Sequence, residues 1–121
     1  MPHVEGTQEQ MKAFLKLELE GPIHMLNLLR FKAQGGRDSY AKYSANTVPL
    51  LHQHGGQMVY RSKAKKTVIG DEVWDEMFII EYPSKDAFFD MIASDDYQKG
   101  VHLRHEALED SRLVCMQPYE T

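Results

Sequence analysis

Hydrophobic and polar positions recur with different periods along the chain, and these periods predict where helices and strands lie. Near the N-terminus, Thr7-Gln8-Glu9-Gln10 has the form of a capping box and precedes hydrophobic residues at roughly helical spacing. This pattern predicts a short helix that Gly21-Pro22 ends. The next run, Ile23–Phe31, is too short and too hydrophobic for a surface helix, so we expect a central strand that is covered on both sides.

The middle of the chain predicts a second helix, from Asp38 or Ser39 to about His54, where Gly55-Gly56 supplies a left-handed stop. The later elements are expected from alternation, turn residues and caps. They are a hairpin of strands over residues 58–68 and 73–82 with a turn at Gly70-Asp71, a helix capped by Ser84, a helix beginning at Ser94-Asp95, and a last strand over residues 111–116.

This order of elements predicts the α+β class, with a ferredoxin-like split β-α-β arrangement around a four-stranded antiparallel sheet. We expect residues 1–121 to form a single domain, in which residues 1–20 are an N-terminal helical extension. The helices suffice to cover one face of the sheet, yet Met77 and Ile79 make the second face hydrophobic as well. A second copy of the chain is the simplest cover for that face, so a homodimer is predicted.

Composition and charge exclude several classes of protein. The formal net charge of −4 argues against a nucleic-acid partner. Cys115 is the single cysteine, which rules out an intramolecular disulfide and suits a reducing compartment. No hydrophobic run approaches membrane-spanning length, and the first residues lack the features of a signal peptide. We therefore expect a cytoplasmic protein that makes no membrane contact.

Several segments between about Gly21 and Gln117 match the strand ends and turns of a known family. They are Pro22–Phe31, the pair Tyr40 and Tyr43, His54-Gly55-Gly56, Ile80–Ser84 and residues 94–114. Together they resemble a bacterial family of domains of unknown function in the dimeric α/β-barrel superfamily. The resemblance implies a barrel-like dimer of two facing sheets with a cavity in each half. Its relatives include cofactor-independent monooxygenases, isomerases and haem-handling proteins, so it implies an architecture and no single mechanism.

Polar residues in hydrophobic strands are the first candidates for chemistry. Asn27 either satisfies a neighbouring group or points into a cavity and orients a ligand carbonyl. His24 and Arg30 lie on the opposite face of the same strand, and they are the natural base and anion anchor if that face lines the cavity. Glu81 needs a raised pKa or a basic partner, and Arg30 or Arg61 is the expected partner. His24 and Glu81 are therefore the predicted catalytic residues, with structural ion pairs as the alternative.

The remaining candidates lie on the predicted helices. Tyr40 and Tyr43 are one turn apart, a spacing typical of core tyrosines whose phenolic tips reach the rim. His102 and His105 are three residues apart, but no recognised metal signature accompanies them, so we predict no metal and no cofactor. The predicted ligand-binding residues are Asn27, Arg30, Tyr40, Tyr43, Arg61 and His105.

Two interpretations of function remain open at this point. The first is a dimer with a mostly hydrophobic pocket in each subunit for a small organic molecule, whose activity is cofactor-independent proton transfer or oxygenation. The second is a non-catalytic dimerisation module, in which the sheet faces bury each other and the polar residues are structural. A concave pocket with converging polar groups distinguishes the first interpretation from the second.

Overall fold

Residues 2–120 are described by the structure, a computed structural model, and they form four strands and four helices. These are α1 (Gln8–Lys16), β1 (Ile23–Phe31), α2 (Gly36–Gln53), β2 (Gln57–Lys63), β3 (Glu76–Tyr82), α3 (Lys85–Ala93), α4 (Asp95–Ala107) and β4 (Leu108–Met116). The strands pair antiparallel in one sheet with the order β2-β3-β1-β4. The α+β ferredoxin-like fold predicted from the sequence is confirmed.

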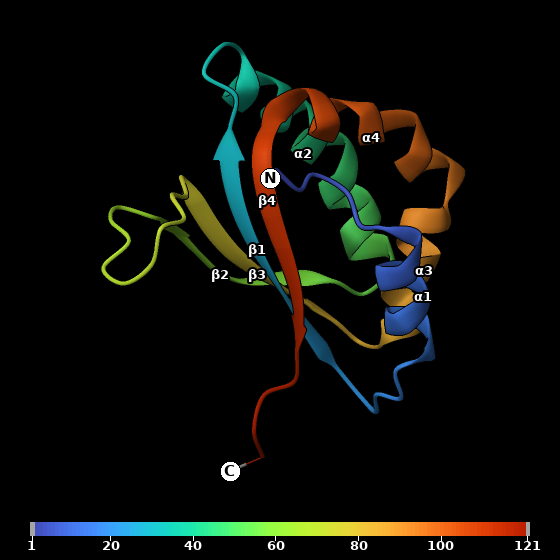
Figure 1. Cartoon of the computed structure of the whole chain (residues 1–121). Helices are drawn as coiled ribbons and strands as arrows, with labels where there is room; N and C mark the ends of the chain where they lie inside the picture. The colour runs from blue at the N-terminus through green and yellow to red at the C-terminus, as the bar shows by residue number, and fades with distance from the viewer. Residues whose placement is uncertain (1, 121) are drawn as a thin grey trace.

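The helices lie on one side of the sheet, and the hydrophobic core is between them and the strands (Figure 1). Ile23, Met25 and Leu29 of β1 and Phe78 and Ile80 of β3 are buried on this side. They occupy every second position because successive side chains of a strand point to opposite faces. We call this the helical face of the sheet.

The other face of the sheet is not covered by any helix of the described residues, and we call it the open face (Figure 1). The strand register places Leu26 opposite both Ile79 and Val114, and Leu28 opposite Met77. All five side chains belong to the face opposite the buried core residues. The hydrophobic second face expected from the sequence is therefore present, and a single chain leaves it in contact with water.

Helix α2 begins earlier than the sequence predicted. It starts at Gly36, after Gly35 in the left-handed conformation (φ 76°), and no side chain caps it. Asp38 lies in the first turn instead, where a carboxylate interacts favourably with the helix dipole. The end of the helix is as predicted: Gly55 has a φ of 81°, and the Gly56 N–H donates to the carbonyl oxygen of Leu51 at 2.8 Å.

The connection between β2 and β3 is longer than the predicted turn at Gly70-Asp71, because residues 64–75 belong to neither strand. Asp75 directly precedes β3 and fixes this end of the connection to the neighbouring strands. Its N–H donates to the carbonyl oxygen of Leu29 at 2.8 Å, and its carboxylate accepts from the N–H of Phe31 at 2.9 Å. The carbonyl oxygen of Asp75 also accepts from the N–H of Ala64 at 3.0 Å, so the backbone pairing of the hairpin reaches Ala64 and Asp75.

Helix α1 has the predicted capping box but ends earlier than predicted. The Thr7 hydroxyl accepts from the Gln10 N–H, and the Gln10 side chain accepts from the Thr7 N–H, both at 3.0 Å. The helix ends at Lys16, before Gly21-Pro22. At this end of the helix, the Lys85 ammonium donates to the backbone carbonyl oxygens of Leu15 and Leu17 at 2.5 and 2.6 Å. Each helix in residues 2–120 is too short or too polar to cross a membrane.

Candidate functional site

A cavity of about 1260 Å³ lies between the helical face of the sheet and the helices that cover it. Its lining comes from all four strands and all four helices, and from residues 3–6 of the N-terminal segment. Hydrophobic and aromatic side chains such as Met25, Phe78 and Phe88 dominate it, as is typical of small-molecule sites. The polar side chains that reach it include Asn27, Tyr40, Tyr43, Arg61, Glu76 and His105.

Asn27 is placed on the cavity by the pleat of β1. It lies on the helical face with Met25 and Leu29, opposite Phe78 of β3. Its Nδ2 donates to the carbonyl oxygen of Met25 at 3.1 Å. The hydrogen bonds among the described residues leave the amide oxygen of Asn27 open. The side chain is therefore held at one end by its own strand and remains able to bind a donor at the other.

Three tyrosines give the cavity neutral hydrogen-bonding groups. The hydroxyls of Tyr43 (α2) and Tyr97 (α4) are 2.9 Å apart and buried, and the ring of Tyr40 lies 5.2 Å from that of Tyr43. The two helices approach closely at Gly100, where a Cβ would lie 2.3 Å from Asn46 Nδ2. Burial raises the pKa of Tyr40 and of Tyr43 above the ordinary tyrosine value. Both phenols are therefore protonated donors at neutral pH.

Thr47 lies one turn after Tyr43 on α2 and also lines the cavity. Its hydroxyl oxygen is buried and has no hydrogen-bond partner among residues 2–120. Leaving a buried hydroxyl unsatisfied costs about 1–3 kcal/mol, so a bound molecule that supplies a partner is favoured at this position. The sequence placed Thr47 on the same stripe of the helix as Tyr40 and Tyr43. That its hydroxyl lacks a partner depends on how α2 packs against the sheet and was not predicted.

The charged pair beside the cavity is Arg61 of β2 with Glu76 of β3, joined by a hydrogen bond from Arg61 Nε to Glu76 Oε1. The Glu76 side chain is only 11% exposed, whereas that of Arg61 is 65% exposed. The expected pairing of Arg61 with Glu81 is therefore wrong. Positions 76 and 81 are an odd number of residues apart, so the two carboxylates lie on opposite faces. Glu76 was missed, although its spacing of two from Phe78 could have placed it on the cavity face.

The predicted catalytic pair lies on the open face, outside the cavity. His24 Nε2 is 2.9 Å from Glu81 Oε2, and Gln57 donates to Glu81 Oε1 at 3.2 Å. The hydrogen bonds from His24 and from Gln57 lower the pKa of Glu81, whereas a general base in a hydrophobic pocket has a raised one. Arg30 shares this face, with Nη2 at 4.0 Å from Asp110 Oδ2. These three residues form ion pairs at the ends of the strands.

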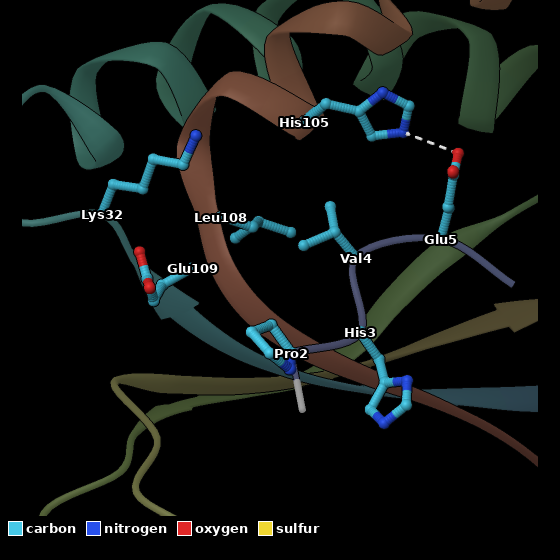
Figure 2. Close-up of a pocket in the computed structure, with 8 residues that line it drawn as sticks. All are labelled: Pro2, His3, Val4, Glu5, Lys32, His105, Leu108 and Glu109. Atoms are coloured by element: carbon cyan, nitrogen blue, oxygen red, sulfur yellow. Dashed lines mark ion pairs between the residues drawn. The ribbon is translucent and has the colours of Figure 1, made fainter.

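His105 lies where the cavity meets a smaller hollow of about 480 Å³ beside residues 2–5 (Figure 2). Its Nε2 is 3.6 Å from Glu5 Oε2. Figure 2 shows Val4 and Leu108 pointing toward one another at the centre of this hollow. Side chains of the chain itself thus occupy the space, and we interpret the smaller hollow as the seat of the N-terminal segment.

Cys115 of β4 also lines the cavity. Burial raises the pKa of its thiol above the ordinary value, so the reactive thiolate is the minor form at neutral pH. Within residues 2–120, no three His, Cys, Asp or Glu side chains converge as a metal site requires. The groups available for chemistry in the cavity include the Asn27 amide, the tyrosine and Thr47 hydroxyls, the Cys115 thiol, His105 at its edge and the Arg61–Glu76 pair.

Comparison with known families and structures adds independent findings. Residues 33–118 match a family described as Domain of unknown function (DUF1330). A protein of unknown function from Rhodopseudomonas palustris is 37% identical, with 100% of each chain covered, and superimposes with a TM-score of 0.92. Among curated proteins, none matches this sequence.

Two more distant structures share the fold alone. A dimeric protein of unknown function with a ferredoxin-like fold, from Bacteroides fragilis, is 9% identical over 83% of this chain and 99% of its own, with a TM-score of 0.57. SnoaB from Streptomyces nogalater, described as a cofactor-independent oxygenase, is 14% identical over 84% of this chain and 97% of its own, with a TM-score of 0.60.

Proposed function

The chain belongs to the DUF1330 family of domains of unknown function, and from that premise we propose that it binds a small, uncharged organic molecule in its large cavity. We further propose that the bound molecule undergoes cofactor-independent proton transfer or oxygenation. The observation that carries this proposal is the cavity itself, in which Asn27, Tyr40 and Thr47 offer neutral hydrogen-bonding groups within a mainly hydrophobic lining. A structural module has no need of such an arrangement.

The charge state of the cavity supports an uncharged ligand. Three of its four guanidinium groups already have polar partners: Arg61 donates to Glu76, Arg112 to Asp110, and Arg104 to the carbonyl oxygen of Val4. The fourth, Arg37, is exposed and lies over the ring of Phe31. An anionic ligand buried inside the cavity would lose its hydration without gaining a buried guanidinium that lacks a partner. A molecule with carbonyl or hydroxyl oxygens instead finds donors in the Tyr40 phenol and the Thr47 hydroxyl.

Glu76 is the carboxylate placed to accept a proton in this cavity. Its mostly buried carboxylate is oriented by Arg61, so one side of the group is fixed while the other faces the ligand space. Proton removal next to a carbonyl or from a phenol leaves negative charge on oxygen, which the Arg61 guanidinium and the Tyr40 hydroxyl are placed to stabilise. The resulting electron-rich anion is the form of an organic molecule that reacts with dioxygen. An oxygenase of the same fold, SnoaB, works without a cofactor, which supports this reaction class.

Thermal shift with matched probes tests ligand binding. We expect naphthol and naphthoquinone to raise the melting temperature and naphthoate, which is of similar size but anionic, to leave it unchanged. Asn27→Ala should weaken the effect of the neutral probes, whereas the control Arg30→Gln, on the opposite face of the same strand, should retain it. Stabilisation by naphthoate alone, or equal loss in both variants, would contradict the proposal.

Oxygen consumption tests the reaction class. With a neutral ligand identified by the screen, we expect metal-free and flavin-free protein to consume dioxygen or to exchange ligand protons with deuterated solvent. Glu76→Gln should abolish either reaction while binding persists, because an amide hydrogen-bonds the ligand but does not accept its proton. Binding without either reaction would favour a non-catalytic binding module.

We also propose that two copies associate through the open face. Leu26, Met77, Ile79 and Val114 form a hydrophobic surface that no helix of the described residues covers, and the Bacteroides fragilis protein of the same fold is dimeric. Light scattering should give twice the chain mass of 14.0 kDa at micromolar concentration. Val114→Asp should shift the mass toward that of one chain. A single-chain mass for the unmodified protein across this range would contradict the dimer.

A further inference from the structure

The connection between β2 and β3, residues 64–75, exposes hydrophobic side chains at its tip, and we call this connection the arm. Val68 is 88% exposed and Ile69 is 93% exposed, and Val73 further along is 60% exposed. Side chains that stay in water contribute nothing to the folding of their own chain through hydrophobic burial. A β-branched pair at the tip of a projecting arm is therefore best explained by contact with another molecule.

The base of the arm is fixed to the sheet, so its tip has a defined position. Besides the bonds of Asp75 to the end of β1, the guanidinium of Arg112 on β4 lies 5.1 Å from the ring centroid of Trp74. Arg112 also donates to the Glu72 carboxylate at 2.5 Å. The Thr67 hydroxyl donates to the carbonyl oxygen of Glu72 and closes the arm across its two sides. An arm held in this way loses little further conformational freedom when it binds.

The arm extends on the side of the open face. Figure 1 shows it as the yellow-green connection that projects from the sheet away from all four helices. Tyr60 of β2 is 52% exposed and lies opposite Ile79, so it belongs to the open face and continues the hydrophobic surface toward the arm. A body that covers the open face therefore meets the arm as well.

We propose that the arm binds a second copy of this chain and extends the interface made by the open faces, with Val68 and Ile69 buried against the partner. The inference rests on the homodimer proposed above and adds a specific contact to it. If a second copy covers the open face, it also lies next to the arm, so the same partner can bury Val68 and Ile69.

Charge indicates how the two copies are oriented. Lys65 and Lys66 on the arm are exposed and make no ion pair among residues 2–120. Glu18 and Glu20, which precede β1 at the opposite end of the sheet, are also exposed and make no ion pair among these residues. A two-fold packing with antiparallel strand directions brings the lysines of one copy toward the glutamates of the other. The parallel packing would bring the two arms and their lysines together, which is unfavourable.

Sedimentation equilibrium on purified full-length protein tests the arm. Val68→Ser with Ile69→Ser should raise the dimer dissociation constant about tenfold or more and leave the urea denaturation of the monomer unchanged. Leu15→Gln is the matched control, because Leu15 is an exposed hydrophobic residue (56%) on the helical side, and it should leave the dissociation constant unchanged. A dimer that the arm variant leaves equally tight would overturn the inference while the proposed homodimer stands. A monomeric unmodified protein would overturn the homodimer itself.

Two further measurements address contact and orientation. Amide hydrogen exchange of residues 65–71 should be slower above the dissociation constant than below it, and exchange rates independent of concentration would overturn the arm contact. Lys65→Glu should weaken the dimer, and adding Glu20→Lys should restore at least part of the affinity. Absence of any restoration would overturn the antiparallel orientation.

Discussion

The paired hydroxyls of Tyr43 and Tyr97 permit a quantitative test of how the helical layer closes the cavity. The pair joins α2 to α4 at 2.9 Å, and both side chains are less than a tenth exposed. Phenylalanine retains the ring and removes only the hydroxyl, so each single substitution leaves the other hydroxyl buried without its partner. We expect Tyr43→Phe and Tyr97→Phe each to lower the free energy of unfolding by about 1–3 kcal/mol.

The double variant should be less destabilised than the sum of the two single variants. Once both hydroxyls are gone, no polar group is left unsatisfied, and the net contribution of one hydrogen bond is about 0.5–1.5 kcal/mol. The two single effects together amount to about 2–6 kcal/mol, so the coupling energy between the two positions should be about 1.5–4.5 kcal/mol. For a chain of this length, each single substitution should lower the melting temperature by about 3–10 °C.

Urea denaturation at one fixed protein concentration, followed by circular dichroism, measures these quantities. The protein concentration is held constant because dimer formation would otherwise change the apparent stability. Strictly additive effects, with a coupling energy near zero, would refute the reasoning, because they would show that each hydroxyl is satisfied independently of the other. Single-variant effects below about 0.5 kcal/mol would refute it as well, because they would show that this part of the cavity is hydrated.

Three other predictions follow from the titratable groups. Burial raises the pKa values of the buried tyrosines, so the protein should become less stable as pH rises above about 10, because the unfolded chain then releases protons that the folded chain retains. Urea midpoints between pH 9 and 11.5 measure this loss, and Tyr43→Phe should make the stability fall less steeply with pH. Glu81 has a lowered pKa, so its contribution to stability is present at neutral pH and is lost as pH falls below the ordinary pKa of a glutamate. Urea denaturation at pH 7 should show that Glu81→Gln is slightly less stable than the unmodified protein, and not more stable. Cys115, whose pKa is raised by burial, should react with a maleimide more slowly than free cysteine at pH 7, and a ligand in the cavity should slow it further.

Local sequence was sufficient to predict the order of helices and strands, the fold class and the hydrophobic second face of the sheet. Each of these follows from periodicity over a few residues: Ile23–Phe31 is hydrophobic apart from His24, Asn27 and Arg30, and Met77 and Ile79 alternate with the core residues of the same strand. The same is true of the capping box at Thr7 and the helix stop at Gly55. Such features depend on neighbours in the chain, which the sequence displays directly.

The composition of the cavity depended on packing between segments that are distant in the chain. Alternation correctly separated Asn27 from His24 and Arg30, but it did not show which face of the strand the helices would cover. That choice placed Glu76 in the cavity beside Arg61 and left Glu81 with His24 on the open face. The bond from the Phe31 N–H to the Asp75 carboxylate likewise had no signal in local periodicity, because it joins residues more than forty positions apart. The pleat therefore assigns residues to two groups, and contacts across the fold decide which group lines the cavity.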